Sequence, residues 1–272
     1  MYFNAPQLVH TMGKGETVRG VTCLGDEVFI VCDGKAEVQV FSVDTFTLKR
    51  CLPVIGLSNA WDLASCAQNY NLYGINYNGN DVFKVDIRGN ATNSSSWTVN
   101  GATYTLSVTD KPSVLVSIYN TSKLKEFTGD GRLIREIDVS QIAPGPFHSV
   151  QLSNNQFLVS SNSGAQRLHV IDEDGKLVQS HSSQTESAIG QVQDLSHLIV
   201  DKQGFIAAAD YSNNKVLLFS PSLTYVRELI SADKGLPKEP IRMHFDEKRR
   251  LLFVVGFKDG HLSVFGGKTG TG

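Results

Sequence analysis

Short apolar segments recur along the chain at a nearly constant spacing, and each ends in a large aliphatic or aromatic residue followed by a turn. These anchor residues are Phe41, Val85, Phe127, Ile171, Phe219 and Phe265. Successive anchors lie 44, 42, 44, 48 and 46 residues apart. A period of this length along a whole chain indicates a repeat architecture, in which each repeat is one supersecondary unit.

Each repeat divides into four short β-type runs separated by turn residues. The first repeat reads VRGVTCL, EVFIVC, EVQVFSV and TLKRCLPV, with Gly25-Asp26, Asp33-Gly34 and Asp44-Thr45 between the runs. Such dipeptides tolerate positive φ and suit tight hairpins. No segment has the length and caps of an ordinary amphipathic helix. The pattern therefore predicts an all-β fold, a six-bladed β-propeller of four-stranded antiparallel blades.

The sixth repeat lacks its outer strand, because the chain runs from HLSVFGG directly into KTGTG. The missing strand is available at the other end of the chain, in residues 6–13. We expect this N-terminal strand to pair with the strand at residues 262–265 and to close the ring, since closure removes exposed sheet edges. Residues 1–267 are then expected to form one NHL-like propeller domain, and residues 268–272 a tail or a cloning remnant.

Charge is nearly balanced, with 25 basic and 27 acidic residues, which gives no global electrostatic case for nucleic-acid binding. No apolar run approaches the roughly 18 residues that a membrane span needs, and the N-terminus has no signal pattern. We therefore expect a cytoplasmic protein with no membrane partner, monomeric as an isolated domain. The four cysteines, Cys23, Cys32, Cys51 and Cys66, include no CxxC pair and are expected to be buried reduced thiols.

The fifth repeat resembles an NHL repeat over residues 195–229. The matching positions are Asp201, Gly204, Asp210, Asn214 and Lys215. The sixth repeat keeps the first aspartate but has Gly256 at the second. The resemblance implies an NHL-repeat six-bladed β-propeller, like the C-terminal domain of tripartite-motif (TRIM) proteins. WD and kelch patterns are weaker, because the Trp-Asp dipeptide at Trp61 and the Gly-Gly doublet at Gly266 each occur once.

In a propeller, the first strand of each blade lines the central channel. Aligning these strands predicts a ring of side chains at one rim, made of Arg19, Trp61, Asp62, Tyr104, His148, His197 and Arg242, with Lys35 and Lys123 added by neighbouring segments. Trp, Tyr and Arg are enriched at binding hot spots. We interpret the chain as a non-catalytic binding scaffold that recognises a protein or peptide partner at this rim, with no catalytic residues, cofactor or metal.

Two alternatives stay open. Some NHL propellers of TRIM proteins bind RNA hairpins, and a basic rim with Lys35, Lys123 and Arg242 would suit that role, with Trp61 or Tyr104 stacking on a base. Asp33, Asp62 and Asp259 at the same rim oppose it.

The second alternative is a metal-dependent propeller enzyme, such as a lyase or lactonase. His148 and His197 loosely resemble two of the three zinc-binding histidines of the peptide-amidating lyase, but the third histidine is missing, because His244 lies two residues further along its strand. Calcium-dependent propeller lactonases need a Glu/Asn/Asn/Asp set in the channel, whereas Asp62 is the only carboxylate expected on the inner strands here.

Overall fold

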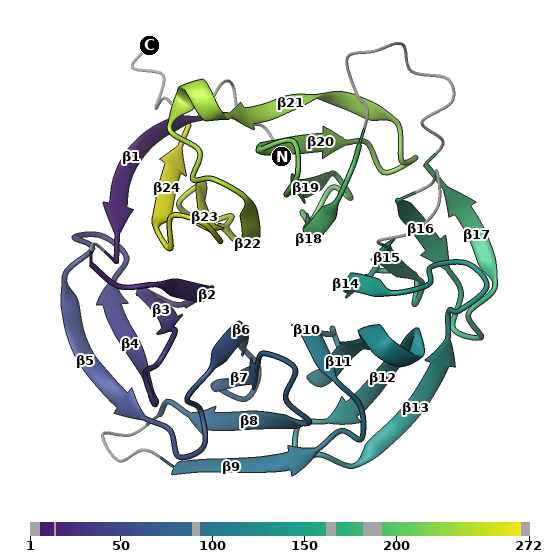
Figure 1. Cartoon of the computed structure of the whole chain (residues 1–272), viewed down its shortest axis with the longest axis horizontal. Coiled ribbons are helices and arrows are strands. Elements are labelled where there is room, and N and C mark those ends of the chain that lie inside the picture. The colour runs from purple at the N-terminus through teal and green to yellow at the C-terminus, as the bar shows by residue number, and fades with distance from the viewer. Residues whose placement is uncertain (1–5, 14, 89–92, 162–166, 182–191, 268–272) are drawn as a thin grey trace.

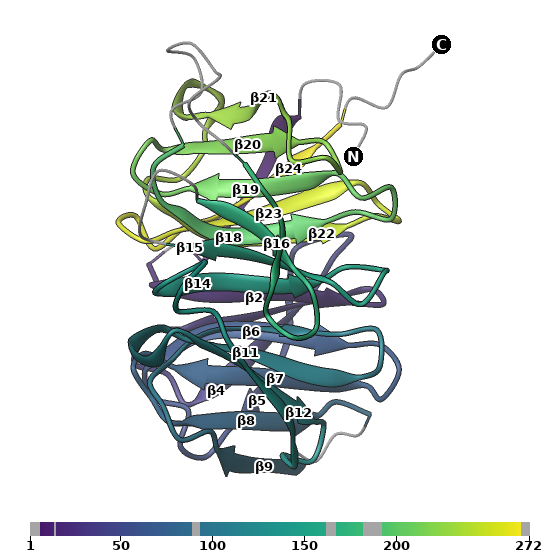
Figure 2. The same ribbon diagram turned by 90° about the vertical axis from the view of Figure 1, so that its right-hand side faces the viewer.

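The chain forms a ring of six four-stranded antiparallel sheets around a central axis, as Figure 1 shows along that axis and Figure 2 from the side. This computed structural model describes residues 6–13, 15–88, 93–161, 167–181 and 192–267. Each sheet is one blade, and its strands follow one another from the axis to the perimeter in sequence order, except in the last blade. The predicted all-β, six-bladed propeller is therefore confirmed.

The strands match the repeats read from the sequence. Blade 1 contains β2 (Val18–Leu24), β3 (Glu27–Cys32), β4 (Glu37–Ser42) and β5 (Leu48–Pro53), and blade 2 contains β6 (Ala60–Cys66), β7 (Asn71–Asn76), β8 (Asp81–Asp86) and β9 (Asn93–Thr98). Blade 3 contains β10 (Thr103–Val108), β11 (Ser113–Ile118), β12 (Lys123–Thr128) and β13 (Leu133–Asp138), and blade 4 contains β14 (Pro146–Gln151), β15 (Phe157–Ser161), β16 (Leu168–Ile171) and β17 (Leu177–Ser180). Blade 5 contains β18 (Leu195–Val200), β19 (Ile206–Asp210), β20 (Lys215–Phe219) and β21 (Tyr225–Ser231).

Blade 6 joins the two ends of the chain. It contains β22 (Pro240–Asp246), β23 (Leu251–Gly256) and β24 (Leu262–Gly266), and its outer strand is β1 (Gln7–Met12). The register runs antiparallel from Gln7 opposite Gly266 to Met12 opposite Leu262, and Figure 1 shows the purple β1 beside the yellow β24. The predicted closure by the N-terminal strand is confirmed. The tail predicted at residues 268–272 lies outside the described residues.

The core is divided among the junctions between neighbouring blades. Val85 of blade 2 packs with Phe29 and Val31 of blade 1, and Phe265 of blade 6 packs with Leu218 of blade 5. The remaining anchor residues lie at the other four junctions in the same way. Burying one such side chain contributes about 1.5–3 kcal/mol. The period of the anchors in the sequence is therefore the period of packing between neighbouring blades.

Helix is confined to single turns in the part of the chain that the structure describes. These are the 3-10 turns η1 (Tyr119–Thr121) and η3 (Ala232–Lys234). Over those residues, no helix has the length and apolar character needed to cross a membrane. The expectation of four buried thiols is right for Cys23, Cys32 and Cys66 but wrong for Cys51, which is exposed. Cys51 lies on the outer strand β5, whose solvent-facing positions have no neighbouring blade to cover them.

Candidate binding site at the channel mouth

Each of the six inner strands has an irregular register near its N-terminal end. In every one of them, the register with the second strand shifts by one residue at the same place. Such a β-bulge sets two consecutive residues against one partner residue, so the usual alternation of side chains breaks there. We call the bulged residues the mouth layer: Arg19, Trp61, Tyr104, Phe147, Ser196 and Ile241. The residues that follow them form the channel layer: Gly20, Asp62, Thr105, His148, His197 and Arg242.

This register corrects the alignment of the predicted ring. Arg19, Trp61 and Tyr104 belong to the mouth layer, whereas Asp62, His148, His197 and Arg242 belong to the channel layer. The residue after the channel layer is apolar in five blades, as at Leu63, but in blade 4 it is Ser149 and the apolar Val150 follows one position later. An alignment on the apolar residues is therefore shifted by one residue in blade 4. The sequence alignment merged two adjacent layers because a bulge adds a residue without changing the apolar pattern of the strand. It therefore passed over Phe147.

The channel layer holds a buried ion pair that joins two blades. Nε of Arg242 lies 3.0 Å from Oδ1 of Asp62, and the two side chains are 1% and 2% exposed. The N–H does not point at the carboxylate closely enough to form a hydrogen bond, so the attraction is mainly coulombic. Arg242 also donates to the carbonyl oxygens of Ile241 (2.7 Å) and Tyr104 (3.2 Å).

The Asp62 carboxylate is further bound by two backbone N–H groups. Oδ1 accepts from Leu63 (2.9 Å), and Oδ2 accepts from Leu106 of blade 3 (3.0 Å). Burial raises the pKa of Asp62, while Arg242 and these backbone donors act in the opposite direction. Hydrogen bonds to the charged form favour it. The pair thus links blades 2, 3 and 6 beneath the mouth layer.

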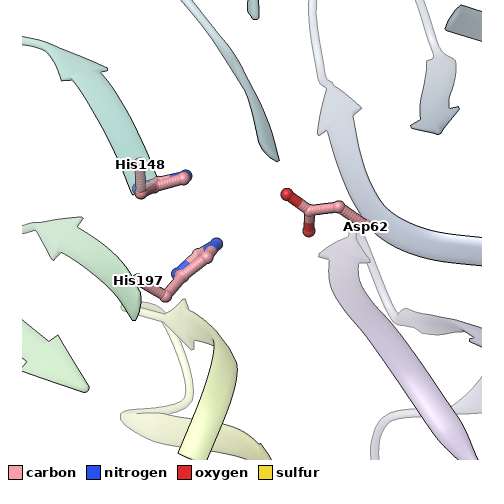
Figure 3. A group of neighbouring side chains, drawn as sticks. All are labelled: Asp62, His148 and His197. Carbon is pink, nitrogen blue, oxygen red and sulfur yellow. The ribbon is translucent and has the colours of Figure 1, made fainter. Parts of the chain in front are cut away.

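Two histidines face this ion pair from blades 4 and 5. The rings of His148 and His197 stack with centroids 3.8 Å apart, and Figure 3 shows them directed towards Asp62. Burial lowers the pKa of His148 to about 3, with a further contribution from the Arg242 charge, and the Leu106 backbone counteracts part of the shift. Burial also holds the pKa of His197 well below its usual value, aided by the charges of His148 and Arg242. Both rings are neutral at neutral pH.

The hydrogen bonds of His148 fix where its proton sits. Its Nδ1 accepts from the N–H of Leu198 (3.2 Å), so the neutral ring carries its proton on Nε2. That Nε2 is buried and has no hydrogen-bond partner among the described residues, and the same is true of Nδ1 of His197. A group with a pKa near 3 is a poor general base at neutral pH, because effective bases titrate near the working pH.

Asp62, His148 and His197 are also the described residues that come closest to a metal site. One ligand atom from each lies within 4.8 Å of the other two. A metal at Nε2 of His148 would require the proton on Nδ1, which instead faces the Leu198 N–H. The adjacent Arg242 guanidinium already provides the positive charge that the Asp62 carboxylate needs. The donor set therefore fits a bound cation poorly.

The mouth layer extends outward into a cluster of aromatic rings. Trp61 contacts Tyr77 (4.5 Å between centroids), Phe257 (5.9 Å) and Tyr104 (6.1 Å). Tyr104 contacts Phe147 (5.2 Å) and Tyr119 (5.7 Å), and Phe257 contacts Tyr211 (6.2 Å). We call these seven residues the aromatic mouth. Tyr77, Tyr119 and Phe257 are 44%, 40% and 36% exposed.

Four of these aromatic residues occupy one equivalent position, directly after the second strand of a blade. They are Tyr77, Tyr119, Tyr211 and Phe257. Blade 1 has Asp33 at this position. From the segments that follow the second strands, the sequence pattern indicated only polar residues, such as Lys35 and Lys123, as part of the rim. A recurrent aromatic residue at a fixed offset after the second strand was the signal that could have found the cluster.

Two arginines already stack on the aromatic mouth. The Arg19 guanidinium lies 4.5 Å from the Phe257 ring centroid and 5.8 Å from that of Trp61. The buried Arg242 lies 5.1 Å from the Trp61 centroid and 5.9 Å from that of Tyr104. Cations over aromatic faces are attracted by the ring quadrupole. Arg19 additionally donates to the Phe257 carbonyl oxygen (3.1 Å) and lies 3.7 Å from Asp33.

The two lysines predicted for this rim are paired with carboxylates. Lys35 contacts Glu16, and Lys123 contacts Glu136. Lys125 is buried, lies 3.3 Å from Glu136 and donates to the carbonyl oxygens of Val99 and Asn100. The structure therefore brings Arg19, Trp61, Tyr104 and the channel layer together, and it pairs Lys35 and Lys123 with glutamates.

A cavity of about 1040 Å³ opens at the opposite end of the channel, where the inner strands end. Its wall includes Cys23, Val108, Gln151, Ile199 and His244. Several of its charged residues pair with one another, as in Arg249 with Asp246 and Lys202 with Glu247, each at 3.0 Å. The channel thus has a polar and apolar cavity at one end and the aromatic mouth at the other.

No protein-family model and no curated protein match this sequence. Solved structures match the fold. Virginiamycin B lyase from Staphylococcus aureus superposes with a TM-score of 0.69 at 12% identity, over 96% of this chain and 98% of the lyase. The β-propeller domain of Cps50 (Swd1) from Myceliophteria thermophila gives 0.63 at 14% identity, over 96% and 99%. A chain of the mitotic checkpoint complex gives 0.64 at 12% identity, over 93% and 76%.

These solved structures include an enzyme and a chain of a protein assembly. At such low identity the likeness shows the fold alone. The NHL and TRIM-like resemblance has no support from a family model. The chain thus shares the β-propeller architecture with distant neighbours, and its function must be argued from its own residues.

Proposed function

We propose that this propeller is a non-catalytic binding module that holds a protein or peptide partner at the aromatic mouth. The observation that carries the proposal is the cluster of seven aromatic residues at one end of the channel, of which Tyr77, Tyr119 and Phe257 are substantially exposed. Exposed large apolar groups gathered in one place are characteristic of interaction sites. The ion pair of Asp62 and Arg242 lies beneath the mouth layer, so a ligand is bound at the surface of the mouth.

The charges around the mouth favour a protein partner over RNA. Phosphate recognition needs unpaired cations, because affinity comes largely from neutralising the backbone. Lys35 and Lys123 are each paired with a glutamate, and Arg242 is buried. Propeller chains of similar fold belong to protein assemblies such as the mitotic checkpoint complex.

The test is capture of partners by the immobilised propeller from a cell extract. The variant Tyr77→Ala/Tyr119→Ala/Phe257→Ser removes the three most exposed aromatic side chains of the mouth and leaves the channel layer intact. The matched control is Tyr70→Ala, which removes a still more exposed tyrosine (53%) from the turn before β7 at the opposite rim. We expect the triple variant to lose at least one specific partner that Tyr70→Ala retains. An unchanged set of partners would refute binding at the mouth.

A second candidate is a propeller enzyme, such as a lyase, that acts at the two histidines. It is supported by the proximity of Asp62, His148 and His197 and by the likeness to virginiamycin B lyase, whose histidine-to-alanine variant is catalytically inactive. The low pKa of His148 and its contact with the Leu198 N–H oppose this candidate. One equivalent of bound metal in purified protein, lost in His148→Asn, would favour the enzyme.

A further inference from the structure

The aromatic mouth carries two carboxylates on the side formed by blades 5 and 6. The backbone carbonyl oxygen of Asp194 accepts from the N–H of Tyr211, and that of Glu239 accepts from the N–H of Phe257. Each acidic residue is therefore held beside an aromatic residue of the mouth by a backbone hydrogen bond. The Tyr211 hydroxyl also donates to the Glu239 carboxylate at 2.9 Å.

Neither carboxylate has a cationic partner. The Asp194 side chain accepts a hydrogen bond from the Ser212 hydroxyl, and that of Glu239 accepts one from the Tyr211 hydroxyl. Within the described ranges, no ion pair reaches either residue. Both are partly buried, which makes an uncompensated negative charge more costly than in open solvent. By contrast, Glu16, Glu126 and Glu228 elsewhere in the ring are all paired with Lys or Arg.

The two carboxylates also affect the pKa values of neighbouring tyrosines. Burial raises the pKa of Tyr211 to about 12, together with the adjacent Glu239 carboxylate, and Asp194 adds to the effect. Burial is likewise the main cause of the raised pKa of Tyr104, to which Asp194 again contributes. Asp194 therefore interacts electrostatically with two aromatic residues that belong to different blades.

Two buried polar atoms, one in the mouth and one in the channel layer beneath it, also lack partners among the described residues. The Trp61 indole N–H is buried, with the residue 7% exposed, and has no hydrogen-bond acceptor among the residues described. The buried Nδ1 of His197 is also unpartnered. Buried polar atoms are normally hydrogen-bonded, so each unpartnered one requires an explanation. A ligand or ordered water at the mouth would provide it.

The mouth already shows which chemical group its rings accept. Two guanidinium groups, those of Arg19 and Arg242, lie over Trp61, Tyr104 and Phe257. The ring of Tyr211 has no such partner among the cation–π contacts of the described residues, and it lies between the two unpaired carboxylates in the chain of contacts described above. A planar cation over an aromatic face, with carboxylates at its edge, is the arrangement that a guanidinium favours.

We propose that the aromatic mouth binds an arginine side chain of a peptide partner, with the guanidinium placed beside Tyr211 and neutralised by Asp194 and Glu239. This inference rests on the proposed function, because it names the chemistry of the partner at the same site. An arginine of the partner would place a third guanidinium on the aromatic mouth, beside Tyr211. It would also supply the positive charge that the two carboxylates lack.

The experiment selects peptides from a random display library on the immobilised propeller and then measures binding of the selected peptide by isothermal titration. We expect one position of the selected peptides to be arginine. Replacing that arginine by citrulline, which has nearly the same shape without the charge, should weaken binding at least tenfold. The variant Asp194→Asn/Glu239→Gln should weaken binding of the arginine peptide to a similar extent and leave the citrulline peptide unaffected.

The matched control is Asp26→Asn/Asp110→Asn, which removes two exposed carboxylates from the turns after β2 and β10 at the opposite rim. It should leave both affinities unchanged. Selected peptides that lack arginine but lose binding in Tyr77→Ala/Tyr119→Ala/Phe257→Ser would overturn this inference and leave the proposed function standing. Failure to select any peptide that depends on those three aromatic residues would overturn the proposed peptide-binding function, and the inference with it.

Discussion

Replacing Arg242 by methionine tests whether the buried ion pair is a structural link between blades. Methionine retains most of the apolar stem and removes the guanidinium. The change leaves the Asp62 carboxylate buried with its two backbone hydrogen bonds but without a counter-charge. It also leaves the carbonyl oxygens of Ile241 and Tyr104 without their side-chain donor.

The expected loss is large. Removing one partner of a buried ion pair costs about 3–5 kcal/mol, because the other charge stays uncompensated. For a chain of this size, 1 kcal/mol shifts the melting temperature by roughly 2–4 °C. We therefore expect Arg242→Met to melt about 6–20 °C below the parent. A control, Arg88→Met, removes the arginine of an exposed pair with Asp86, in which the arginine side chain is 63% exposed. Its melting temperature should stay close to that of the parent, because solvent screens exposed ion pairs.

The measurement is thermal unfolding at several pH values, with Asp62→Asn/Arg242→Met as a second variant. Without the guanidinium, the pKa of Asp62 in the folded state lies still further above its unfolded value. In Arg242→Met, protonation of Asp62 at low pH therefore raises the free energy of unfolding, and this contribution is lost as the pH rises. The deficit of Arg242→Met should thus shrink as the pH falls from about 7 towards 5. The double variant should lack this dependence and be more stable at neutral pH than Arg242→Met. A melting temperature as little changed as that of Arg88→Met would refute the reasoning.

Three further predictions concern closure, acid stability and RNA. Deleting residues 1–12 removes β1 and leaves β24 as an open edge, so the melting temperature should fall by more than about 5 °C; a truncated chain that melts like the parent would contradict closure. Burial lowers the pKa of His148 to about 3 and that of His244 to about 4, so both are neutral when folded and protonated when unfolded below about pH 6.5. The free energy of unfolding should have its full value above that pH and decrease below it by up to about 1.4 kcal/mol per pH unit for each histidine. The urea unfolding midpoint of His148→Asn should therefore decrease less steeply than that of the parent between about pH 6 and pH 4. Reversing the charges of Lys35 and Lys123 together should not change binding to RNA hairpins in a gel-shift assay; a salt-sensitive affinity that these changes abolish would establish the RNA alternative.

Most of the architecture could be predicted because it depends on local patterns that repeat. The anchors, from Phe41 to Phe265, recur because each blade must bury the same face against its neighbour. The strand missing from the sixth repeat pointed to β1 for the same reason, since an unpaired edge in a ring is costly. These inferences needed only the periodicity of one sequence.

The site was predictable in part. The residue types at the starts of the inner strands were identified, but the bulge that separates Trp61 from Asp62 into two layers was not, because it leaves the apolar pattern unchanged. Lys35 and Lys123 were assigned to a basic rim, although their neighbours Glu16 and Glu136 neutralise them. Glu16 is 19 residues from Lys35 and Glu136 is 13 residues from Lys123, and only strand pairing brings each pair together.

The sequence by itself determined the repeat, the strand class and the way the ring closes, because these follow from short-range periodicity and from the cost of an open edge. Only the tertiary structure decided that Asp62 meets Arg242, 180 residues away in sequence. It likewise decided that aromatic residues from five blades form one mouth. The physical reason is that a ring brings equivalent positions of all blades to one axis. Their individual side chains, which vary freely from repeat to repeat, combine there into a single site.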